Sequence, residues 1–299
     1  MSKQPPFENK LAILGCLLGA CCWGIIWYPY RILAQSGLAG LASSFYTYVI
    51  AVLIASVLLA KHWRRIKNTP NSIVWLCLVA GWTNLSYVVA VIDGEVMRVM
   101  LLFYLSPIWT LVLAHFWLHE KTSKTGYIAI AISLVGAYIM LANPLDAPSG
   151  TLALPMPQSS SDWLALSAGL GFALTNVMTR KASDLSLHAK SFAVWIGVMT
   201  MVLFWLPFMH VSLPAPQLLT SKQWLIMTLI ALLIMAATYS VQYGVTKMTA
   251  TRASVLFLFE LIVAAVASYY LSNEVMTLSE WIGGALILAA AVFAALNER

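Results

Sequence analysis

Charged residues are scarce in this chain. Asp, Glu, Lys and Arg together make up 9% of its 299 residues, whereas hydrophobic residues make up 61%. A soluble domain of this size could not cover so much apolar surface, so we expect an integral membrane protein in a lipid bilayer. The net charge of +6 lies in short gaps between apolar runs, without a basic stripe and interleaved stacking aromatics, and therefore predicts no nucleic-acid partner.

Several chemical motifs are also missing. The sequence has no Walker loop, no dinucleotide-binding fingerprint and no G-x-S-x-G elbow, which argues against ATP-driven pumping and familiar catalysis. We expect neither an enzyme nor a cofactor. Four cysteines lie inside apolar runs, without the spacing of a zinc site or a disulfide framework. His115, His119 and Glu120 superficially suggest a metal site, but their order and the lack of a third ligand nearby favour an interfacial role.

Long apolar segments dominate what remains. A bilayer core of roughly 30 Å requires about 20 apolar residues in a helix. Helices are expected because lipid offers no partner to open strand edges. The first segment has no convincing cleavage site before it and is expected to remain as a span. The sequence therefore predicts an all-α integral membrane protein with ten transmembrane helices near residues 11–33, 41–60, 73–92, 97–118, 125–142, 162–181, 190–209, 223–244, 251–272 and 278–297.

The basic residues orient these helices. Most of the 17 Lys and Arg fall before the first helix or in the gaps after every second helix, which predicts cytoplasmic N- and C-termini. The longest gap, residues 143–161, carries prolines and serines but no Lys or Arg, and we interpret it as a non-cytoplasmic linker between residues 1–142 and 162–299. Because each half holds five helices, an odd number, the second half is expected to be inverted, as in secondary transporters.

Two segments support this duplication. Arg98–Glu120 and Arg252–Glu274 have the same length and the same charged ends. The second holds Glu260 near its middle, where the first holds Ser106. Ionisable residues inside membrane spans are functional hypotheses by default, so Glu260 is the coupling candidate, able to bind a substrate amine or exchange a proton. A carboxyl hydrogen-bonded to a neighbouring helix is the structural alternative.

Other polar and aromatic residues recur at helical spacing. Trp23 and Trp27 correspond in the second half to Phe172 and Asn176, and Arg31 corresponds to Arg180. Gly15 and Gly19 form a G-x-x-x-G that permits a close helix contact. Tryptophans nearer the predicted helix ends are interpreted as interfacial belt residues: Trp63, Trp75, Trp163, Trp224 and Trp281. The candidate substrate cavity consists of Trp23, Trp27, Asn84, Tyr87, Tyr104, Ser106, Phe172, Asn176, Tyr239, Gln242, Tyr243 and Glu260.

The ordered motifs resemble the EamA-type transporters of the drug/metabolite transporter superfamily. They are Trp23-Gly24, Tyr104-Leu105-Ser106-Pro107, Leu118-His119-Glu120, Phe259-Glu260-Leu261, Leu271-Ser272-Asn273-Glu274 and Trp281-Ile282-Gly283-Gly284-Ala285. The resemblance implies a ten-helix inverted-repeat transporter, often an exporter of amino acids or related metabolites. Pro107 predicts a kink in the fourth span. Leu261 stands where the family usually has proline in the ninth, which leaves open whether that span shares the kink.

These features favour a secondary transporter that exports small organic metabolites, with amino acids as the expected class, through an aromatic-lined cavity by alternating access. Proton coupling through Glu260 is a hypothesis within this scheme. Efflux of cationic drugs or dyes is the alternative within transport. A membrane-embedded lipid-modifying enzyme is a weaker alternative, because Asp93 and Glu95 are the one close acidic pair. We expect the protein in the plasma (bacterial inner) membrane, with a monomer as the simplest interpretation.

Overall fold

The computed structural model describes residues 6–38, 40–62, 72–93, 96–120, 123–142, 157, 159–272 and 278–296. The chain within these ranges is helical and contains no strand. Most of the linker predicted at residues 143–161, together with Trp63 and Glu274, lies outside them. Within them, six segments are long and apolar enough to cross a membrane: Asn9–Gln35, Gly40–Leu58, Ile73–Ala90, Leu187–Trp205, Ser221–Lys247 and Ala250–Leu271.

All ten predicted spans correspond to helices, and two of them are each divided into two helices. The 3₁₀ turns η1 (Ala60–His62) and η2 (Pro216–Leu218) lie in connections between them. The helices are α1 (Pro6–Gln35), α2 (Gly40–Leu58), α4 (Ser72–Asp93), α5 (Val96–Phe103), α6 (Ser106–Leu118), α7 (Lys124–Ala142), α8 (Ser160–Lys181), α9 (Leu187–Trp205), α10 (Ser221–Lys247), α11 (Ala250–Phe257), α12 (Phe259–Ser272) and α13 (Leu278–Leu296).

Several helix starts follow from local capping. The Ser159 hydroxyl accepts the backbone N–H of Asp162, whose carboxylate accepts the Ser159 N–H, so α8 begins two residues before the predicted span. Thr220 and Gln223 form the same reciprocal pair at the start of α10. Gln223 also donates to Ser36 at the end of α1, which ties the two helices together.

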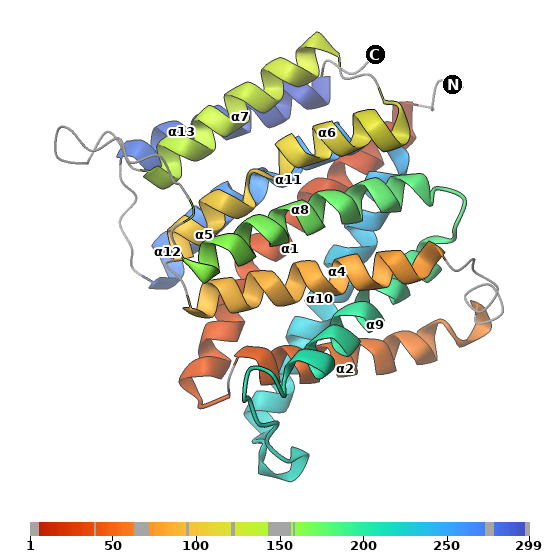
Figure 1. The fold of residues 1–299 in the computed structure, drawn as a ribbon, viewed down its shortest axis with the longest axis vertical. Coiled ribbons are helices and arrows are strands. Elements are labelled where there is room, and N and C mark those ends of the chain that lie inside the picture. Colours follow the sequence, from red (N-terminus) through yellow and green to blue (C-terminus); the bar gives the residue numbers. More distant parts are fainter. Residues whose placement is uncertain are drawn as a thin grey trace.

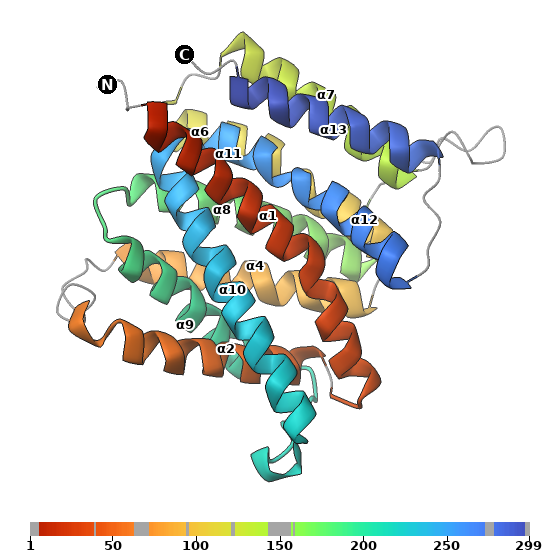
Figure 2. The ribbon, with the colours of Figure 1, turned by 180° about the vertical axis from the view of Figure 1, so that it is seen from behind.

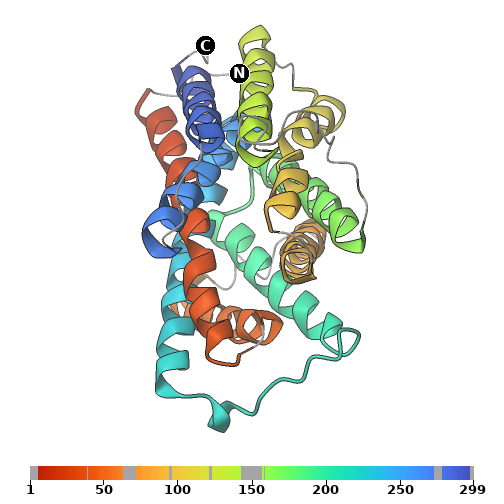
Figure 3. The same ribbon diagram turned by 90° about the vertical axis from the view of Figure 1, so that its left-hand side faces the viewer.

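The packing of the helices has the pattern expected of an inverted repeat. Helix α1 packs along α10, and their counterparts α8 and α4 pack along each other in the same way. Helix α4 also packs on α9, as its counterpart α10 packs on α2. The pair α7 and α13 lies at one edge of the molecule, whereas α2 and α9 lie at the opposite edge (Figures 1 and 3). Each half therefore completes its core with helices of the other.

The contact between α1 and α10 depends on glycine. A side chain at Gly15 would place its Cβ 2.7 Å from the Ser240 carbonyl oxygen, and one at Gly244 would lie 2.8 Å from the Ala12 carbonyl oxygen. Both distances are too short for a real Cβ, so the two backbones approach to a separation that only glycine allows. The close helix contact predicted from Gly15 and Gly19 is confirmed, since a Cβ at Gly19 would also clash with Val241.

The two ends of the bundle differ in charge. The start of α1 and the end of α13 lie at the same end, together with the ends of α6 and α8 (Figures 1 and 2). Arg180, Lys181, Lys247 and Arg252 belong to helix termini at this end, which we call the basic end. Arg31 and Lys222 lie toward the opposite end, near the end of α1 and the start of α10.

Candidate functional site

A row of aromatic rings crosses the middle of the molecule and joins four helices. The Phe103 ring centroid lies 5.0 Å from that of Tyr87 on α4 and 5.5 Å from those of Tyr104 and Phe172. Phe172, on α8, lies in turn 5.4 Å from Phe257 on α11. Because Phe103 and Phe257 occupy corresponding positions in the two halves, Phe172 lies between two repeat-related rings. We call these five residues, together with Glu260, the aromatic centre.

Glu260 lies against this row. The phenol of Tyr104 donates a hydrogen bond to the Glu260 carboxylate, and Tyr87 is close enough to interact with it electrostatically. Tyr104 is 4% exposed, whereas Glu260, Tyr87 and Phe172 each retain a partly exposed surface. Glu260 is the tenth residue beyond Ala250 at the basic end, about 15 Å along the helix axis at 1.5 Å per residue. This depth is close to the middle of a bilayer core of roughly 30 Å.

The aromatic centre forms where two spans are broken. Helix α5 ends at Phe103 and α6 begins at Ser106, while α11 ends at Phe257 and α12 begins at Phe259. The first break is followed by Pro107 in the first turn of α6, which has no N–H to donate. The second has no proline, so Leu261 does not prevent a break in the ninth span. There Leu258 and Leu261 donate to carbonyls three residues earlier, as in a 3₁₀ turn.

Each break is supported by a glycine from the first helix of the other half. A Cβ at Gly169 of α8 would lie 2.6 Å from the Phe103 carbonyl oxygen. A Cβ at Gly24 of α1 would lie 2.9 Å from the Glu260 carbonyl oxygen. Ser106 begins α6 with its side chain buried and its carbonyl bonded to Thr110. The breaks are thus held by backbone packing, which fixes the position of Glu260 relative to the aromatic row.

Two buried amides lie between the aromatic centre and the basic end. Asn176 lies one turn after Phe172 on α8, and Gln242 lies on α10; they are 2% and 3% exposed. The Asn176 Nδ2 and the Gln242 Oε1 are buried without a hydrogen-bond partner among the described residues. Buried polar atoms are nearly always bonded, so these two are candidates for contact with a ligand or with water.

Other predicted cavity residues have partners elsewhere. Asn84 accepts a 3.0 Å hydrogen bond from Tyr48 of α2 and donates to the Ala80 carbonyl of its own helix. Trp23 packs on the large cluster formed by α2, α9 and α10. The Arg31 guanidinium lies over the Trp27 ring, with its Cζ 5.9 Å from the ring centroid. Among the described residues, the recorded hydrogen bonds and ring contacts of these three side chains lie outside the aromatic row.

Tyr239 and Tyr243, both on α10, have further partners. The Tyr239 hydroxyl is hydrogen-bonded to His188 Nδ1 at 2.6 Å, and its ring lies 5.7 Å from that of Trp195, also on α9. Tyr239 and Tyr243 both line a groove of about 360 Å³ between α1 and α10, whose other walls include the exposed leucines Leu14 and Leu18. Tyr243 also packs, like Phe172, on the buried cluster that contains Phe257, so it borders the aromatic centre, whereas the recorded ring partners of Tyr239 are His188 and Trp195.

Metal ligands do not gather in the part of the chain that the structure describes. No group of three or more His, Cys, Asp and Glu side chains comes together there. His119 instead adopts a positive φ of 52° and ends α6, so that the Glu120 N–H bonds back to the Ala114 carbonyl. The side chains of Asp93 and Glu95 lie outside the described residues.

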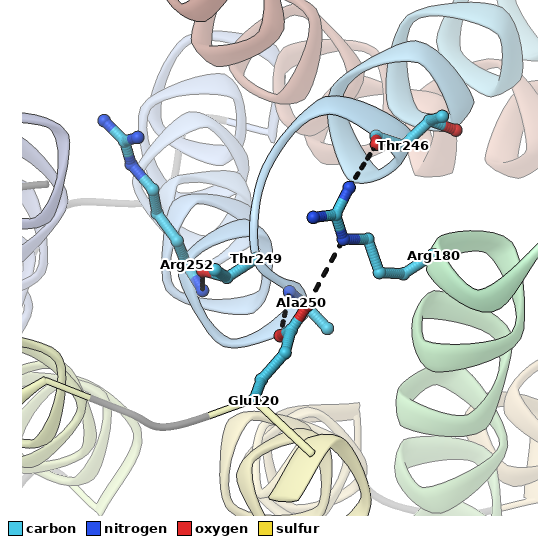
Figure 4. A network of polar contacts seen from close by, with 6 residues as sticks. All are labelled: Glu120, Arg180, Thr246, Thr249, Ala250 and Arg252. Carbon is cyan, nitrogen blue, oxygen red and sulfur yellow. Dashed lines mark hydrogen bonds and ion pairs between the residues drawn. The ribbon is translucent and has the colours of Figure 1, made fainter. Parts of the chain in front are cut away.

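A polar network at the basic end was not predicted as part of the site. Glu120, just beyond α6, accepts a hydrogen bond from Arg180 Nε at 3.2 Å and from the Ala250 backbone N–H at 3.2 Å (Figure 4). Arg180 also donates to the Thr246 carbonyl, and Lys190 donates to the Thr246 hydroxyl. Two sequence features pointed to these residues: Glu120 ends the repeated segment Arg98–Glu120, and Arg180 corresponds to Arg31 in the other half.

These elements define a class: a helical membrane protein with two interlocked, inverted five-helix halves and paired broken helices around a central carboxylate, the organisation of secondary transporters. Comparison with protein families gives the particular family. The model of the EamA-like transporter family matches residues 10–142 and again residues 159–296. The chain belongs to the EamA-like transporter family and is an integral membrane protein.

Individual relatives agree with this assignment. A protein of Archaeoglobus fulgidus described as an uncharacterized transporter is 23% identical over 234 residues, which cover 77% of this chain and 78% of that protein. A solved crystal structure of another protein, 14% identical, has the same fold with a TM-score of 0.73 over 95% of this chain and 97% of that one. The family and the named relative indicate a transporter rather than an enzyme.

Proposed function

We propose that the protein is a secondary transporter that exports amino acids from the cytoplasm across the plasma membrane by alternating access. The observation that carries the proposal is the Glu260 carboxylate, held at a helix break near mid-depth, hydrogen-bonded to Tyr104 and next to a row of aromatic rings. A carboxylate at this depth is costly unless it faces a polar interior or a partner, and such residues mark substrate and ion pathways.

The surrounding groups suit the parts of an amino acid. Glu260 can bind the α-amino group, and the rings of Tyr87, Phe103 and Phe172 can contact an apolar side chain and attract the cationic amine. The Asn176 amide N–H, buried without a partner in the described chain, can donate to the α-carboxylate. A zwitterion would thus satisfy polar groups that are otherwise costly to bury.

Glu260 also supports a hypothesis of proton coupling. If a proton and the substrate amine bind the same carboxylate in turn, return of the empty transporter with a proton drives the next export step. The two halves would rock about the aromatic centre, because Phe103 and Phe257 come from corresponding breaks and meet on Phe172. The positive-inside rule places the basic end at the cytoplasmic side of the membrane in this scheme.

A thermal-shift panel on the purified protein tests the substrate class. A ligand that binds the folded state stabilises it by RT ln(1 + [L]/Kd), about 2.7 kcal/mol at 100 times Kd. We expect a subset of amino acids with apolar or aromatic side chains to raise the melting temperature, and the matched amines or carboxylic acids alone to raise it less. No shift with any amino acid would contradict the proposed substrate class.

Efflux of cationic dyes is the second candidate, since the same carboxylate and rings suit an organic cation. The two functions differ in their use of Asn176, because a dye without a carboxylate has no group for this amide donor. An export-deficient strain carrying the gene separates them: amino acid tolerance without dye resistance supports the proposal, and the reverse result supports dye efflux.

A further inference from the structure

Glu120 joins the two halves of the molecule at one point. Its residue number places it in the first half, just beyond α6, while its partners Arg180 and Ala250 belong to α8 and α11 of the second half. Each carboxylate oxygen has its own partner, Oε1 the guanidinium and Oε2 the backbone N–H. The Glu120 and Arg180 side chains are only 15% and 21% exposed, so the pair is partly shielded from screening by water.

The pair is held in place by further contacts. Arg180 donates through Nη1 to the Thr246 carbonyl at the end of α10, while Thr246 accepts from the buried Lys190 of α9. The Thr246 hydroxyl donates in turn to the Gln242 carbonyl. Figure 4 shows Glu120 lying between Arg180 and the first turn of α11. Four helices of the second half are therefore connected at this end to the end of α6.

This network lies at the basic end, on the helices that lead there from the aromatic centre. Phe172, Asn176 and Arg180 are four residues apart along α8 and share one face of the helix. Arg180 is eight residues beyond Phe172, about 12 Å along the axis toward the basic end. Helix α11 leads from Ala250 to the break at Phe257, and α6 leads from the break at Ser106 to Glu120. Of the three helices joined by Glu120, α8 and α11 carry Phe172 and Phe257 of the aromatic centre, and α6 begins at the break beside Tyr104.

We propose that the Glu120–Arg180 pair, with the Ala250 N–H, is a gate that closes the passage between the aromatic centre and the basic end. The proposal rests on the transport function proposed above but not on the substrate. Opening requires the end of α6 to separate from α8 and α11, which breaks both contacts of Glu120 at once. The structure represents the state in which the basic end is closed.

The opposite end provides a matched control. Arg31 is the repeat counterpart of Arg180, but it lies near the end of α1 away from the basic end, is exposed, and stands over its own helix at Trp27. Removing its charge leaves the Glu120 network intact. Arg31→Gln therefore removes the charge of the arginine that corresponds to Arg180 in the other half, without changing the gate.

Cysteine accessibility tests the gate without any substrate. The reporter is Asn176→Cys in the full chain with the four native cysteines replaced by alanine, labelled by a membrane-impermeant thiol reagent in vesicles of each orientation. We expect Glu120→Ala and Arg180→Gln to increase labelling from the basic end about tenfold, the population change expected for loss of one charge-assisted hydrogen bond. Arg31→Gln is expected to leave it unchanged.

A second reporter separates opening of the gate from loosening of the fold. Ala231→Cys lies in the core of α10, where Ala231 is 0% exposed, and is expected to remain unlabelled in every variant. Unchanged labelling of the Asn176→Cys reporter in both gate variants would overturn the proposal. Labelling of both reporters together would also overturn it, because it would assign Glu120 and Arg180 a role in stability alone. Failure of amino acid binding would leave this result intact.

Discussion

Asn176 and Asn84 show how burial and bonding decide the role of the same side chain. Both are amides inside membrane spans, and the sequence placed both in the cavity. Asn84 has bonding partners on α2 and on its own helix, so its amide holds two helices together. Asn176 Nδ2 has none in the described residues. An unbonded buried amide destabilises a fold by roughly 1–3 kcal/mol and is retained here, we infer, because it serves the substrate.

We therefore expect substitution of these two asparagines to change the stability of the protein in different directions. Asn176→Leu removes an unsatisfied group and is expected to leave the melting temperature equal or higher, while amino acid affinity falls about tenfold or more from loss of a hydrogen bond to a charged group. Asn84→Leu leaves the Tyr48 hydroxyl without its acceptor and is expected to destabilise the protein by roughly 1–3 kcal/mol. Thermal melting with and without ligand measures both. Equal destabilisation by the two variants would show that Asn176 is structural.

Individual residues also mark where sequence analysis was incomplete. Glu260, Tyr87, Tyr104 and Phe172 were candidates because ionisable and aromatic residues inside apolar segments are conspicuous; the structure brings them together, and their role in binding stays a prediction. Tyr243 packs on the same cluster as Phe172 and Phe257, and its place in the substrate cavity stays a prediction. Glu120 and Arg180 are far apart in the chain, and their pairing depends on how the ends of three helices meet.

At the scale of helices, hydropathy and length predicted the ten segments that the structure shows as helices, whereas the interruptions of two of them were only half predicted. Pro107 indicates the first break through its missing N–H. The second break, at Leu258, lacks a proline and is associated with 3₁₀-type bonds and with the contact of Gly24 against the Glu260 carbonyl. That contact is tertiary, so no local pattern in the ninth span could have indicated it.

The α1–α10 contact gives a prediction for helix packing. Gly→Ala in a helix interior is normally stabilising by roughly 0.5–1 kcal/mol. Gly244→Ala is expected to reverse this sign and destabilise by about 1–3 kcal/mol, because the new Cβ would meet the Ala12 carbonyl oxygen at 2.8 Å. Gly284→Ala is the control, since its Cβ would meet only Ile262 at 3.9 Å. Chemical or thermal denaturation in detergent compares them, and equal stability of the two variants would contradict the packing argument.

At the scale of the whole molecule, the two halves share a scaffold but differ in chemistry. Their helices pack in corresponding pairs, and their fourth and ninth spans break at corresponding positions. The mid-span polar groups do not correspond, because Glu260 stands where the first half has Ser106. In the proposed alternating-access scheme, the shared scaffold would supply the two conformations and Glu260 the chemistry.

Transport by Glu260→Gln in proteoliposomes tests the central claim most directly. The substitution keeps the size of the side chain and its ability to accept from Tyr104, but removes the charge that binds the amine and the site that exchanges a proton. We predict that the wild-type protein transports a radiolabelled amino acid chosen from the thermal-shift panel, at a rate that depends on the pH gradient. The variant is expected to lose both the transport and its dependence on pH. Transport by Glu260→Gln at the wild-type rate with unchanged pH dependence would contradict the account.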